Sequence, residues 1–468
     1  MIWGILAVAV TVRLININQS LWLDEAINVL AASNNSFVNM ISQYPIGDFH
    51  PPGWFFILWI WERIGGNGEV WVRLPSVAFG VLTVWFVYLV GKELFTKKVA
   101  LIGSLLMAIA PLHVYYSQEA RMYSLAALSA TMSFHFFWRF VNQKNKWDVV
   151  GYTAANILVL YSDYLAYFII PTQAVYLFWT KNPLKKIILG WLVAIVALLP
   201  WLLVFPKQLT SGTMAAAILP GWANVAGGAT FKELLLIPIK TFFGRVSIDN
   251  KQIYGLIIGL VGLLYGVITW AAVKKIDKST KLLLCWIVIP TTLAFLISFF
   301  IPVLSYFRML FILPAFYLLL AKGIDNLENY GKYAVFGVSL ISLISLGAYY
   351  IYPRFQREDW KTAVPFIESR LKNESIVLLE DNGIFSPYTY YSNNLNKVSP
   401  GLKKIPAMSG KDVKEIPEHI KEIYLFEYLV DITDPERNLQ REIERVGFNK
   451  VETLNFNGVG FVHHFNLK

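Results

Sequence analysis

Long, unbroken apolar runs separated by short lysine-bearing loops constrain this chain more than any other feature of its sequence. The runs are continuous rather than alternating, as in residues 70–90, 187–205 and 252–272. In a bilayer every backbone polar group must be satisfied internally, so apolar runs of this length predict membrane-spanning helices. Only 15% of the 468 residues are charged, against about 25% in soluble domains. The sequence therefore predicts a polytopic α-helical membrane protein.

We expect about eleven transmembrane helices within a domain that covers residues 1–352. The first run is predicted to be a retained helix rather than a signal peptide, because no basic residue precedes it. Two long outer loops interrupt the series, and shorter interfacial or amphipathic helices are expected inside them. The spans are expected at about residues 2–17, 70–90, 99–114, 123–140, 149–179 (a hairpin of two helices), 187–205, 252–272, 306–321 and 333–351, with one more that follows the lysines at 274–281 and ends near residue 302. The outer loops are expected at 18–69 and 206–250. The shorter helices are expected at 26–40, 55–61 and 232–245.

The composition becomes polar from Pro353 onward, and residues 353–468 predict a small soluble α/β domain. Alternating patterns predict strands at 376–379 and 423–426. A helix is predicted at 435–446, with Asp434 as its N-cap and Gly447 just past its end. A shorter helical piece is expected at 413–420. The single cysteine of the chain, Cys285, lies in an apolar run and excludes a disulfide framework.

The lysine-rich loops predict which side of the membrane each segment faces. The formal net charge is +10, but the lysines cluster in short loops, which is typical of topology signals rather than of nucleic-acid binding. The positive-inside rule makes the loops at 92–98, 139–146, 181–186 and 274–281 cytoplasmic. Parity then places the other loops and, with eleven helices, the C-terminal domain on the extracytoplasmic side of the cell membrane.

An enzyme on that outer side cannot use ATP or nucleotide sugars, which are cytosolic. It needs an activated donor that has already been carried across the membrane. A polyprenyl-phosphate-linked sugar fits, because the bilayer holds its tail while the outer surface receives its head group. The bilayer and such a lipid are therefore the expected partners.

Two adjacent carboxylates, Asp24 and Glu25, follow the first apolar run on the predicted outer side. Transfer of a sugar needs a base that takes the acceptor's proton, and a carboxylate partly desolvated by Trp22 is suited to this work. Adjacent residues of a helix cannot point the same way, so we expect one of the two to be the base. The alternative is a solvated acidic pair at the start of an amphipathic helix.

A second outer motif is Asp48-Phe49-His50-Pro51-Pro52. The two prolines hold this loop extended and fix the directions of Asp48 and His50. We expect the loop to form a wall of the substrate site. The alternative is an ordinary helix-start signal, with proline just before an interfacial helix.

A third outer motif spans residues 117–123. If it is helical, Gln118 and Arg121 share one face, and Glu119 and Tyr123 share another. Arg121 is then placed to stabilise a departing phosphate through two parallel hydrogen bonds. The alternative is an internal structural network between Glu119 and Arg121.

Several other polar residues lie near predicted helix ends or in the C-terminal domain. Arg245 and Arg308 are further phosphate-binding candidates, with snorkelling to the interface as the alternative. Asp163 is predicted to be a turn residue, and His113 a satisfied interfacial histidine. His463 and His464 have no partner at metal-ligand spacing, and the sequence shows no strong metal motif.

The order of these motifs resembles a known superfamily. Leu-Trp-Leu-Asp-Glu-Ala at 21–26, then Asp-Phe-His-Pro-Pro at 48–52, then Tyr-Ser-Gln-Glu-Ala-Arg-Met-Tyr at 116–123 resemble the dolichyl-phosphate-mannose protein mannosyltransferase and aminoarabinose transferase superfamily, above all its prokaryotic members. Residues 306–314 and 357–360 are similar to later stretches of such proteins. The short N-terminus, which has no basic flank, departs from the pattern.

The resemblance implies a GT-C fold with juxtamembrane helices in the first outer loop. It also implies inverting transfer from a polyprenyl monophosphate sugar, with Asp24 as the base. Metal use varies within the superfamily, so the resemblance leaves a divalent metal open and names no other cofactor.

We therefore expect a glycosyltransferase that moves a hexosyl or pentosyl group to a lipid, glycan or protein acceptor on the outer face of the membrane. The alternative is a transporter or flippase for a lipid-linked glycan. That function calls for charges near the bilayer midplane and for broken helices in paired halves, whereas the charges of this sequence lie at helix ends. A structural scaffold is a third interpretation, and it leaves the polar residues of the outer loops unexplained.

Overall fold

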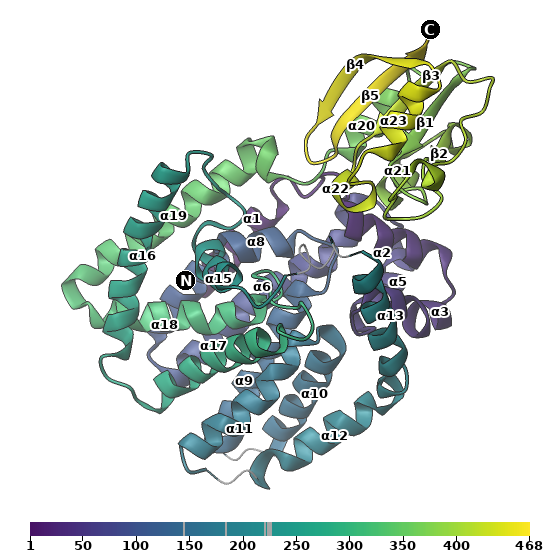
Figure 1. Ribbon diagram of the computed structural model, residues 1–468. Helices are drawn as coiled ribbons and strands as arrows, with labels where there is room; N and C mark the ends of the chain where they lie inside the picture. Colours follow the sequence, from purple (N-terminus) through teal and green to yellow (C-terminus); the bar gives the residue numbers. More distant parts are fainter. Residues whose placement is uncertain (144–145, 183–184, 220, 222–226) are drawn as a thin grey trace. The chain divides into compact units, whose positions relative to one another are not determined.

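The computed structural model describes residues 1–143, 146–182, 185–219, 221 and 227–468 (Figure 1). The chain forms two compact units. The first contains Met1–Ile17, Ser36–Leu209 and Ala226–Ile351, and the second contains Asn18–Asn35, Thr210–Val225 and Tyr352–Lys468. Parts of the predicted basic loops at 139–146 and 181–186, and of the predicted outer loop at 206–250, lie outside the described residues.

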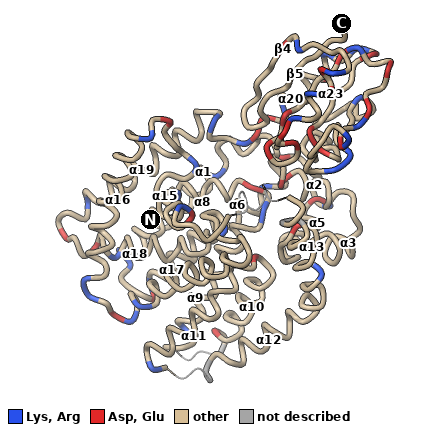
Figure 2. The backbone as a smooth tube through the Cα atoms, viewed as in Figure 1, with Lys and Arg blue, Asp and Glu red and all other residues tan. Residues whose placement is uncertain are grey.

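The first unit is helical, and its charged residues gather at helix ends and in loops (Figure 2). Its elements, with α13 running on into residues of the second unit, are α1 (Ile2–Leu14), α3 (Phe37–Ser42), α4 (Tyr44–Asp48), α5 (Gly53–Gly65), α6 (Glu69–Leu94), α7 (Lys97–Ala108), α8 (Pro111–Ser117), α9 (Tyr123–Gln143), α10 (Lys146–Ser162), η1 (Leu165–Phe168), α11 (Ile169–Trp179), α12 (Lys185–Leu202), α13 (Phe205–Ile218), α15 (Phe231–Phe243), α16 (Lys251–Val273), α17 (Lys278–Ile297), η2 (Leu310–Ile312), α18 (Leu313–Asn326), η3 (Glu328–Tyr330) and α19 (Gly331–Ile351).

Several of these helices are long and apolar enough to cross a membrane. Among the described residues four meet that test, namely α6, α16, α17 and the stretch Glu328–Ile351, and up to six do if each of two bent pairs is one span. Two shorter apolar segments, Ile2–Leu14 and Leu165–Trp179, accompany them. The multi-pass helical fold is confirmed, and the number of about eleven spans stays a prediction.

Three predicted helices differ from the structure where the chain bends. The helix expected at 99–114 is two helices, α7 and α8, which meet at 59° where Pro111 starts the second. A proline is tolerated in the first turn of a helix but breaks the ladder of an uninterrupted one. The helix expected at 187–205 ends at Leu202, and the next one leaves at 58°. The helix expected at 306–321 begins only at Leu313, after the η2 turn.

The amphipathic helix predicted at 26–40 is also two helices, and they belong to different units. α2 (Leu23–Asn34) lies in the second unit, whereas α3 lies in the first. The break falls at Ser36, whose hydroxyl accepts the backbone N–H of Asn39 at 3.3 Å and so starts a new helix. The segments 55–61 and 232–245 are helical, as α5 and α15, and their interfacial position stays a prediction.

The second unit is built on a five-stranded sheet in the order β2-β1-β3-β5-β4. β1 pairs in parallel with β2 and β3, whereas β5 pairs antiparallel with β3 and β4. Besides α2, its elements are η4 (Pro353–Phe355), α20 (Trp360–Glu368), β1 (Ser375–Leu379), α21 (Ser386–Tyr391), η5 (Leu395–Lys397), β2 (Val398–Pro400), η6 (Gly410–Asp412), β3 (Glu422–Phe426), α22 (Val430–Thr433), α23 (Asn438–Arg445), β4 (Phe448–Phe456) and β5 (Gly460–Leu467).

Alternate residues of the central strands face two separate cores. Val377 packs with Trp360 of α20 on one face, and Leu378 packs with Leu439 of α23 on the other. This two-residue period is what a strand buried on both faces requires. Helices therefore cover both sides of the sheet, as the predicted α/β class demands.

One local prediction for the second unit is wrong, and another is confirmed except for the start of the helix. The helical piece expected at 413–420 has no helix, since Pro417 cannot donate to a helical ladder. The helix predicted at 435–446 starts at Asn438, after Arg437 in a left-handed conformation. Asp434 still caps the turn, because its carboxylate accepts the backbone N–H of Leu439 at 2.8 Å. Gly447 follows the helix with φ 102°, as predicted.

A close helix contact at Gly53 yields the first prediction. A Cβ at Gly53 would lie 2.4 Å from the backbone oxygen of Tyr161 on α10, so Gly53→Ala should destabilise the first unit by about 1–3 kcal/mol. Gly47→Ala, in the preceding helix, is the matched control, because nothing lies within 4 Å of the added atom. Thermal unfolding of the detergent-purified protein should show a lower midpoint for the Gly53 variant only. Equal midpoints would contradict the close packing.

Candidate functional site

The loop that carries Asp48 and His50 is shaped by one strained residue between them. Phe49 has φ 66°, in the left-handed region, and ends α4. A non-glycine residue in such a conformation costs about 1–3 kcal/mol and persists only where its surroundings impose it. The reversal at Phe49 turns the side chains of Asp48 and His50 toward each other, and Pro51 and Pro52 then lead into α5.

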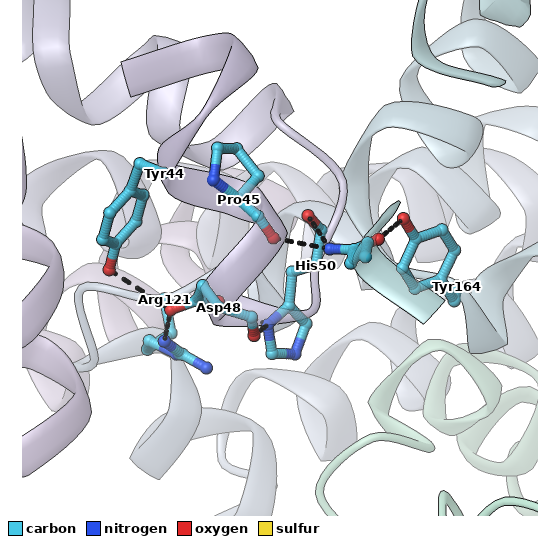
Figure 3. A network of polar contacts seen from close by, with 7 residues as sticks. Tyr44, Pro45, Asp48, His50, Arg121 and Tyr164 are labelled. Carbon is cyan, nitrogen blue, oxygen red and sulfur yellow. Dashed lines mark hydrogen bonds and ion pairs between the residues drawn. The ribbon is translucent and has the colours of Figure 1, made fainter. Parts of the chain in front are cut away.

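Three side chains meet that of Asp48, and we call the four residues the Asp48 cluster: Tyr44, Asp48, His50 and Arg121 (Figure 3). One carboxylate oxygen of Asp48 lies 2.6 Å from Nδ1 of His50. The other accepts Nη1–H of Arg121 at 3.2 Å and the hydroxyl of Tyr44 at 3.3 Å. The side chains of Asp48 and Arg121 are only 8% and 4% exposed, so this ion pair is largely desolvated.

The electrostatics of the cluster favour a charged Asp48. Burial by itself raises the pKa of this carboxyl, but the charges and hydrogen bonds of Arg121 and His50 outweigh burial and hold the pKa below its ordinary value. His50 donates or shares its Nδ1 proton with Asp48, which leaves Nε2 as the other polar atom of the ring. The cluster therefore holds a cationic Arg121 beside an imidazole of fixed orientation.

A glutamine holds the same loop from its other side. Nε2 of Gln208 donates to the backbone oxygen of Pro45 at 2.6 Å and to that of His50 at 3.2 Å. The hydroxyl of Tyr164 donates in turn to Oε1 of Gln208. These residues come from α13 and from the turn after α10, so segments far apart in the sequence fix the backbone around His50 (Figure 3).

The motif at 117–123 is not a helix, which corrects the predicted spacing. α8 ends at Ser117 and α9 begins at Tyr123, and the residues between them form a tight turn in which the N–H of Arg121 bonds to the oxygen of Glu119 at 2.8 Å. The i,i+3 face expected for Gln118 and Arg121 does not exist. The turn instead sends Arg121 to Asp48, while Glu119 is completely buried.

Gln118 lies at the end of α1 rather than in the Asp48 cluster. Its Nε2 donates to the backbone oxygens of Arg13 and Ile15 at 3.0 and 2.6 Å, and its Oε1 accepts the hydroxyl of Tyr349 at 2.9 Å. Its contacts thus satisfy the last carbonyls of a helix. His113 is satisfied only in part: Nη2 of Arg13 lies 2.8 Å from its Nδ1, whereas its buried Nε2 has no hydrogen-bond partner among the described residues, which differs from the satisfied histidine expected from the sequence.

Arg308 and Tyr123 lie outside the Asp48 cluster as defined above, and each packs against Phe307. Nη1 of Arg308 donates to the backbone oxygen of Val303 at 3.2 Å. Asp163 is the turn residue that was predicted, with Oδ1 accepting the N–H of Leu165 at 2.8 Å. Burial raises the pKa of Asp163, and the charges of His50 and Arg308 oppose this rise only in part. Tyr123 packs edge-on against Phe307 with ring centroids 5.5 Å apart.

Arg245 belongs to a second group of cations and rings. Its guanidinium lies 5.1 Å from the ring centroid of Tyr115. Nζ of Lys240 lies 6.0 Å from the centroid of Tyr306, and burial, together with the nearby Arg245, lowers the pKa of this lysine to about 8. Two cations on a largely aromatic surface suit an anionic ligand.

Asp24 and Glu25 lie in the first turn of α2, in the second unit. Glu25 is fully buried and Asp24 is partly exposed, so the two point differently, as adjacent helical residues must. Glu358 lies near Asp24 and accepts Nε1–H of Trp360 and the hydroxyl of Tyr428, both at 2.8 Å. Burial raises the pKa of Glu358 to about 7, and Asp24 contributes to the rise.

Within the described part of the chain, no group of three or more His, Cys, Asp or Glu side chains is placed to hold a metal ion. His463, in β5, faces Glu427 at 3.3 Å.

Sequence reasoning did not single out several residues that the fold brings to these clusters. Tyr44 and Gln208 lie in segments whose pattern indicates only helix or loop. Glu358 stood inside the quoted motif at 357–360, so a signal was present, but its partner Tyr428 lies far along the chain. Glu358 and Tyr428 come into contact only in the folded protein.

Residues 49–205 match the family model described as dolichyl-phosphate-mannose-protein mannosyltransferase, a span that includes His50, Arg121 and Asp163. No curated protein sequence matches the chain significantly.

Three solved structures are similar to this chain as a whole. Apo ArnT from Cupriavidus metallidurans is 12% identical, with a TM-score of 0.59 over 100% of this chain and 98% of that chain. The same protein bound to undecaprenyl phosphate gives a TM-score of 0.56 at 12% identity and the same coverage. The archaeal oligosaccharyltransferase AglB from Archaeoglobus fulgidus, in complex with an inhibitory peptide and a dolichol-phosphate, gives 0.50 at 12% identity over 98% and 74%. These likenesses establish a shared fold.

The ion pair at Asp48 yields the second prediction. Asp48→Asn removes the carboxylate that faces the buried Arg121, and loss of one partner of a buried pair costs about 3–5 kcal/mol. Because the pKa of Asp48 is depressed in the folded protein, its contribution is complete above the ordinary value of 3.8 and is lost as pH falls through the lower, folded pKa. The midpoint of thermal unfolding should therefore drop strongly at pH 7, and the drop should shrink below pH 3.8.

Asp325→Asn is the matched control, because Asp325 pairs with Lys98 at the surface of the same unit. An exposed pair contributes about 0–1 kcal/mol, so this variant should unfold near the wild-type temperature. Similar midpoints for the two variants at pH 7 would contradict the assigned role of the buried pair.

Proposed function

We propose that this chain is a membrane glycosyltransferase that uses a polyprenyl-phosphate sugar, because it has the GT-C fold expected from the sequence and residues 49–205 match the dolichyl-phosphate-mannose-protein mannosyltransferase model. Undecaprenyl phosphate is bound to ArnT and dolichol-phosphate to AglB in the structures named above. A lipid phosphate of this class is the donor carrier that we propose here.

The observation that carries the proposal is the Asp48 cluster. It holds Arg121 and His50, which fall within the segment matched by the mannosyltransferase model, in a largely desolvated site. A guanidinium in such a site can bind a phosphate through two parallel hydrogen bonds and oppose the charge that develops when it departs. Arg308, and the pair of Lys240 and Arg245, are further cations of the same unit that we propose to serve the lipid phosphate.

The proposed reaction is an inverting displacement. The nucleophilic atom of the acceptor attacks the anomeric carbon, the bond from that carbon to the phosphate oxygen breaks, and polyprenyl phosphate leaves. Asp24 takes the proton of the acceptor, as the resemblance implies, and Glu25 supports its helix. The positive-inside rule favours the extracytoplasmic face for this chemistry and for residues 353–468.

The role of Asp24 yields the third prediction. Asp24→Asn keeps the size of the side chain but cannot accept the proton, and loss of general base catalysis lowers the rate by about 10²–10⁴-fold. Transfer from a purified polyprenyl-phosphate sugar to acceptor should therefore be almost abolished, while thermal unfolding stays near wild type. Asp431→Asn, which changes an exposed acid of the same unit, should remain active. An active Asp24 variant would refute the assigned base.

The role of Arg121 yields the fourth prediction. Arg121→Lys keeps the charge but loses the planar fork that binds two phosphate oxygens. Because that interaction strengthens as the phosphate departs, kcat should fall on the order of 10²-fold with a smaller change in the KM for donor. Arg139→Lys is the control, since Arg139 binds Glu93 and Asp148 away from the Asp48 cluster. An unchanged kcat for Arg121→Lys would contradict phosphate stabilisation.

A transporter or flippase of lipid-linked glycans is the competing function. The same assay separates the two, because a transferase releases polyprenyl phosphate and a glycosylated acceptor, whereas a flippase moves an intact lipid across vesicles without releasing either. Released lipid phosphate in detergent solution, where no transbilayer movement exists, would support the transferase.

A further inference from the structure

The chain segment that precedes the Asp24 helix is held by the C-terminal part of the second unit. Oε1 of Gln19 accepts the backbone N–H of Arg357 at 3.0 Å. The hydroxyl of Ser20 accepts the backbone N–H of Lys361 at 3.2 Å. The N–H of Leu21 donates to the hydroxyl of Tyr391 at 2.8 Å. Three consecutive residues are thus fixed by groups that lie more than three hundred positions further along the sequence.

Glu358 lies between two of these contacting residues, Arg357 and Lys361, and its side chain lies near the first turn of α2. The backbone N–H of Leu23, which starts α2, lies close enough to the carboxylate of Glu358 to lower its pKa slightly. The first N–H groups of a helix have no partner within the helix, so an acceptor supplied from outside stabilises its start. Nε1–H of Trp360 and the hydroxyl of Tyr428 hold the same carboxylate, each at 2.8 Å. Asp24 is the residue after Leu23.

The surroundings of Glu358 contain both neutral donors and ionisable groups. Asp24 on α2 and Tyr428 after β3 act on its pKa, and Trp360 of α20 is a neutral donor. Arg357 and Lys361 are the nearest basic residues on its own segment. Gly458, in the turn between β4 and β5, packs on its backbone side and carries no charge. Burial, followed by the smaller effect of Asp24, raises the pKa of Glu358 to about 7, although the hydrogen bonds from Trp360 and Tyr428 oppose the rise.

We propose, resting on the function above, that Glu358 is a positioning residue for Asp24: it fixes the first turn of α2, and its charge sets the pH dependence of proton uptake by Asp24. When Glu358 is ionised, its charge opposes a second negative charge on Asp24 and so favours transfer of the acceptor's proton to Asp24. When Glu358 is neutral, this repulsion is absent. Glu358 exchanges its own proton with solvent and takes none from the substrate.

Glu358→Gln is the primary test, because the amide oxygen still accepts from Trp360 while its NH2 donates to the hydroxyl oxygen of Tyr428. In the wild type, kcat should rise with pH through an inflection near 7. The variant should lack that inflection and lose several-fold in kcat above pH 8, with the KM for donor unchanged. A wild-type profile in this variant would overturn the electrostatic part of the proposal.

The same variant separates a charge effect from loss of structure. Because the pKa of Glu358 is raised in the folded protein, its stabilising contribution is present below the ordinary value of 4.5 and is lost as pH rises through about 7. At pH 8 the glutamine variant should therefore unfold at or above the wild-type temperature, even though its kcat is lower. A lower midpoint at pH 8 would indicate a purely structural role.

Tyr428→Phe is a second variant with a different expected result. It removes an O–H donor that favours the ionised form of Glu358 but leaves the carboxyl in place. The inflection should persist and move above pH 7. Glu374→Gln is the matched control, because Glu374 forms an exposed pair with Lys421 in the same unit, and its profile should match the wild type.

Amide hydrogen exchange tests the positioning part without any activity. In Glu358→Ala the amides of residues 23–26 should exchange faster than in the wild type, whereas Glu374→Ala should leave them unchanged. Equal exchange in both variants would overturn the positioning role. The activity assays distinguish failure of the proposed function from failure of this inference. An inactive wild type would count against the proposed transferase alone. An active wild type with an unaltered pH profile for Glu358→Gln would count against this inference alone.

Discussion

A carboxylate removed from water is stabilised by a cation or by hydrogen-bond donors, and Asp48 and Glu358, one in each unit, meet this constraint in different ways. In the first unit Asp48 is met by the cation Arg121 and by His50, and its pKa falls. In the second unit Glu358 is met by the neutral donors Trp360 and Tyr428, and its pKa rises to about 7. The type of partner, rather than the degree of burial, decides the direction.

This difference assigns distinct chemistry to the two carboxylates. Asp48 remains charged at neutral pH, so it can hold Arg121 and orient His50 but has little tendency to take up a proton. Glu358 changes its charge within the physiological range, which suits a group that adjusts a neighbour. The left-handed conformation of Phe49 costs about 1–3 kcal/mol. The ion pair between Asp48 and Arg121, which this turn allows to form, offsets that cost.

The helical fold was largely predictable because the bilayer leaves an apolar segment no alternative to a helix. The errors fall where a local event interrupts a uniform pattern, as at Pro111, at Ser36 and before Leu313. For the site, the sequence indicated Asp48, His50 and Arg121 one by one. It could not indicate that the turn at 118–122 sends Arg121 to Asp48, because helical spacing was assumed where the chain is not helical.

The largest difference concerns where the Asp24 helix belongs. The sequence placed residues 18–69 in one outer loop, yet Asn18–Asn35 form a compact unit with Tyr352–Lys468. Leu23 packs against the apolar core around Trp360 and Val377, and backbone N–H groups bond across more than three hundred positions of sequence. Contacts of this range leave no periodic signal, so pattern reading cannot find them.

The C-terminal sheet is therefore not an appendage that could be removed without consequence for Asp24. Without the C-terminal part of the second unit, Gln19, Ser20 and Leu21 would lose the groups that fix them, and Leu23 would lose the apolar core on which it packs. A helix of twelve residues is marginal by itself and depends on tertiary packing. The helix that carries the proposed base is consequently folded by the C-terminal unit, although it is encoded between two segments of the helical one.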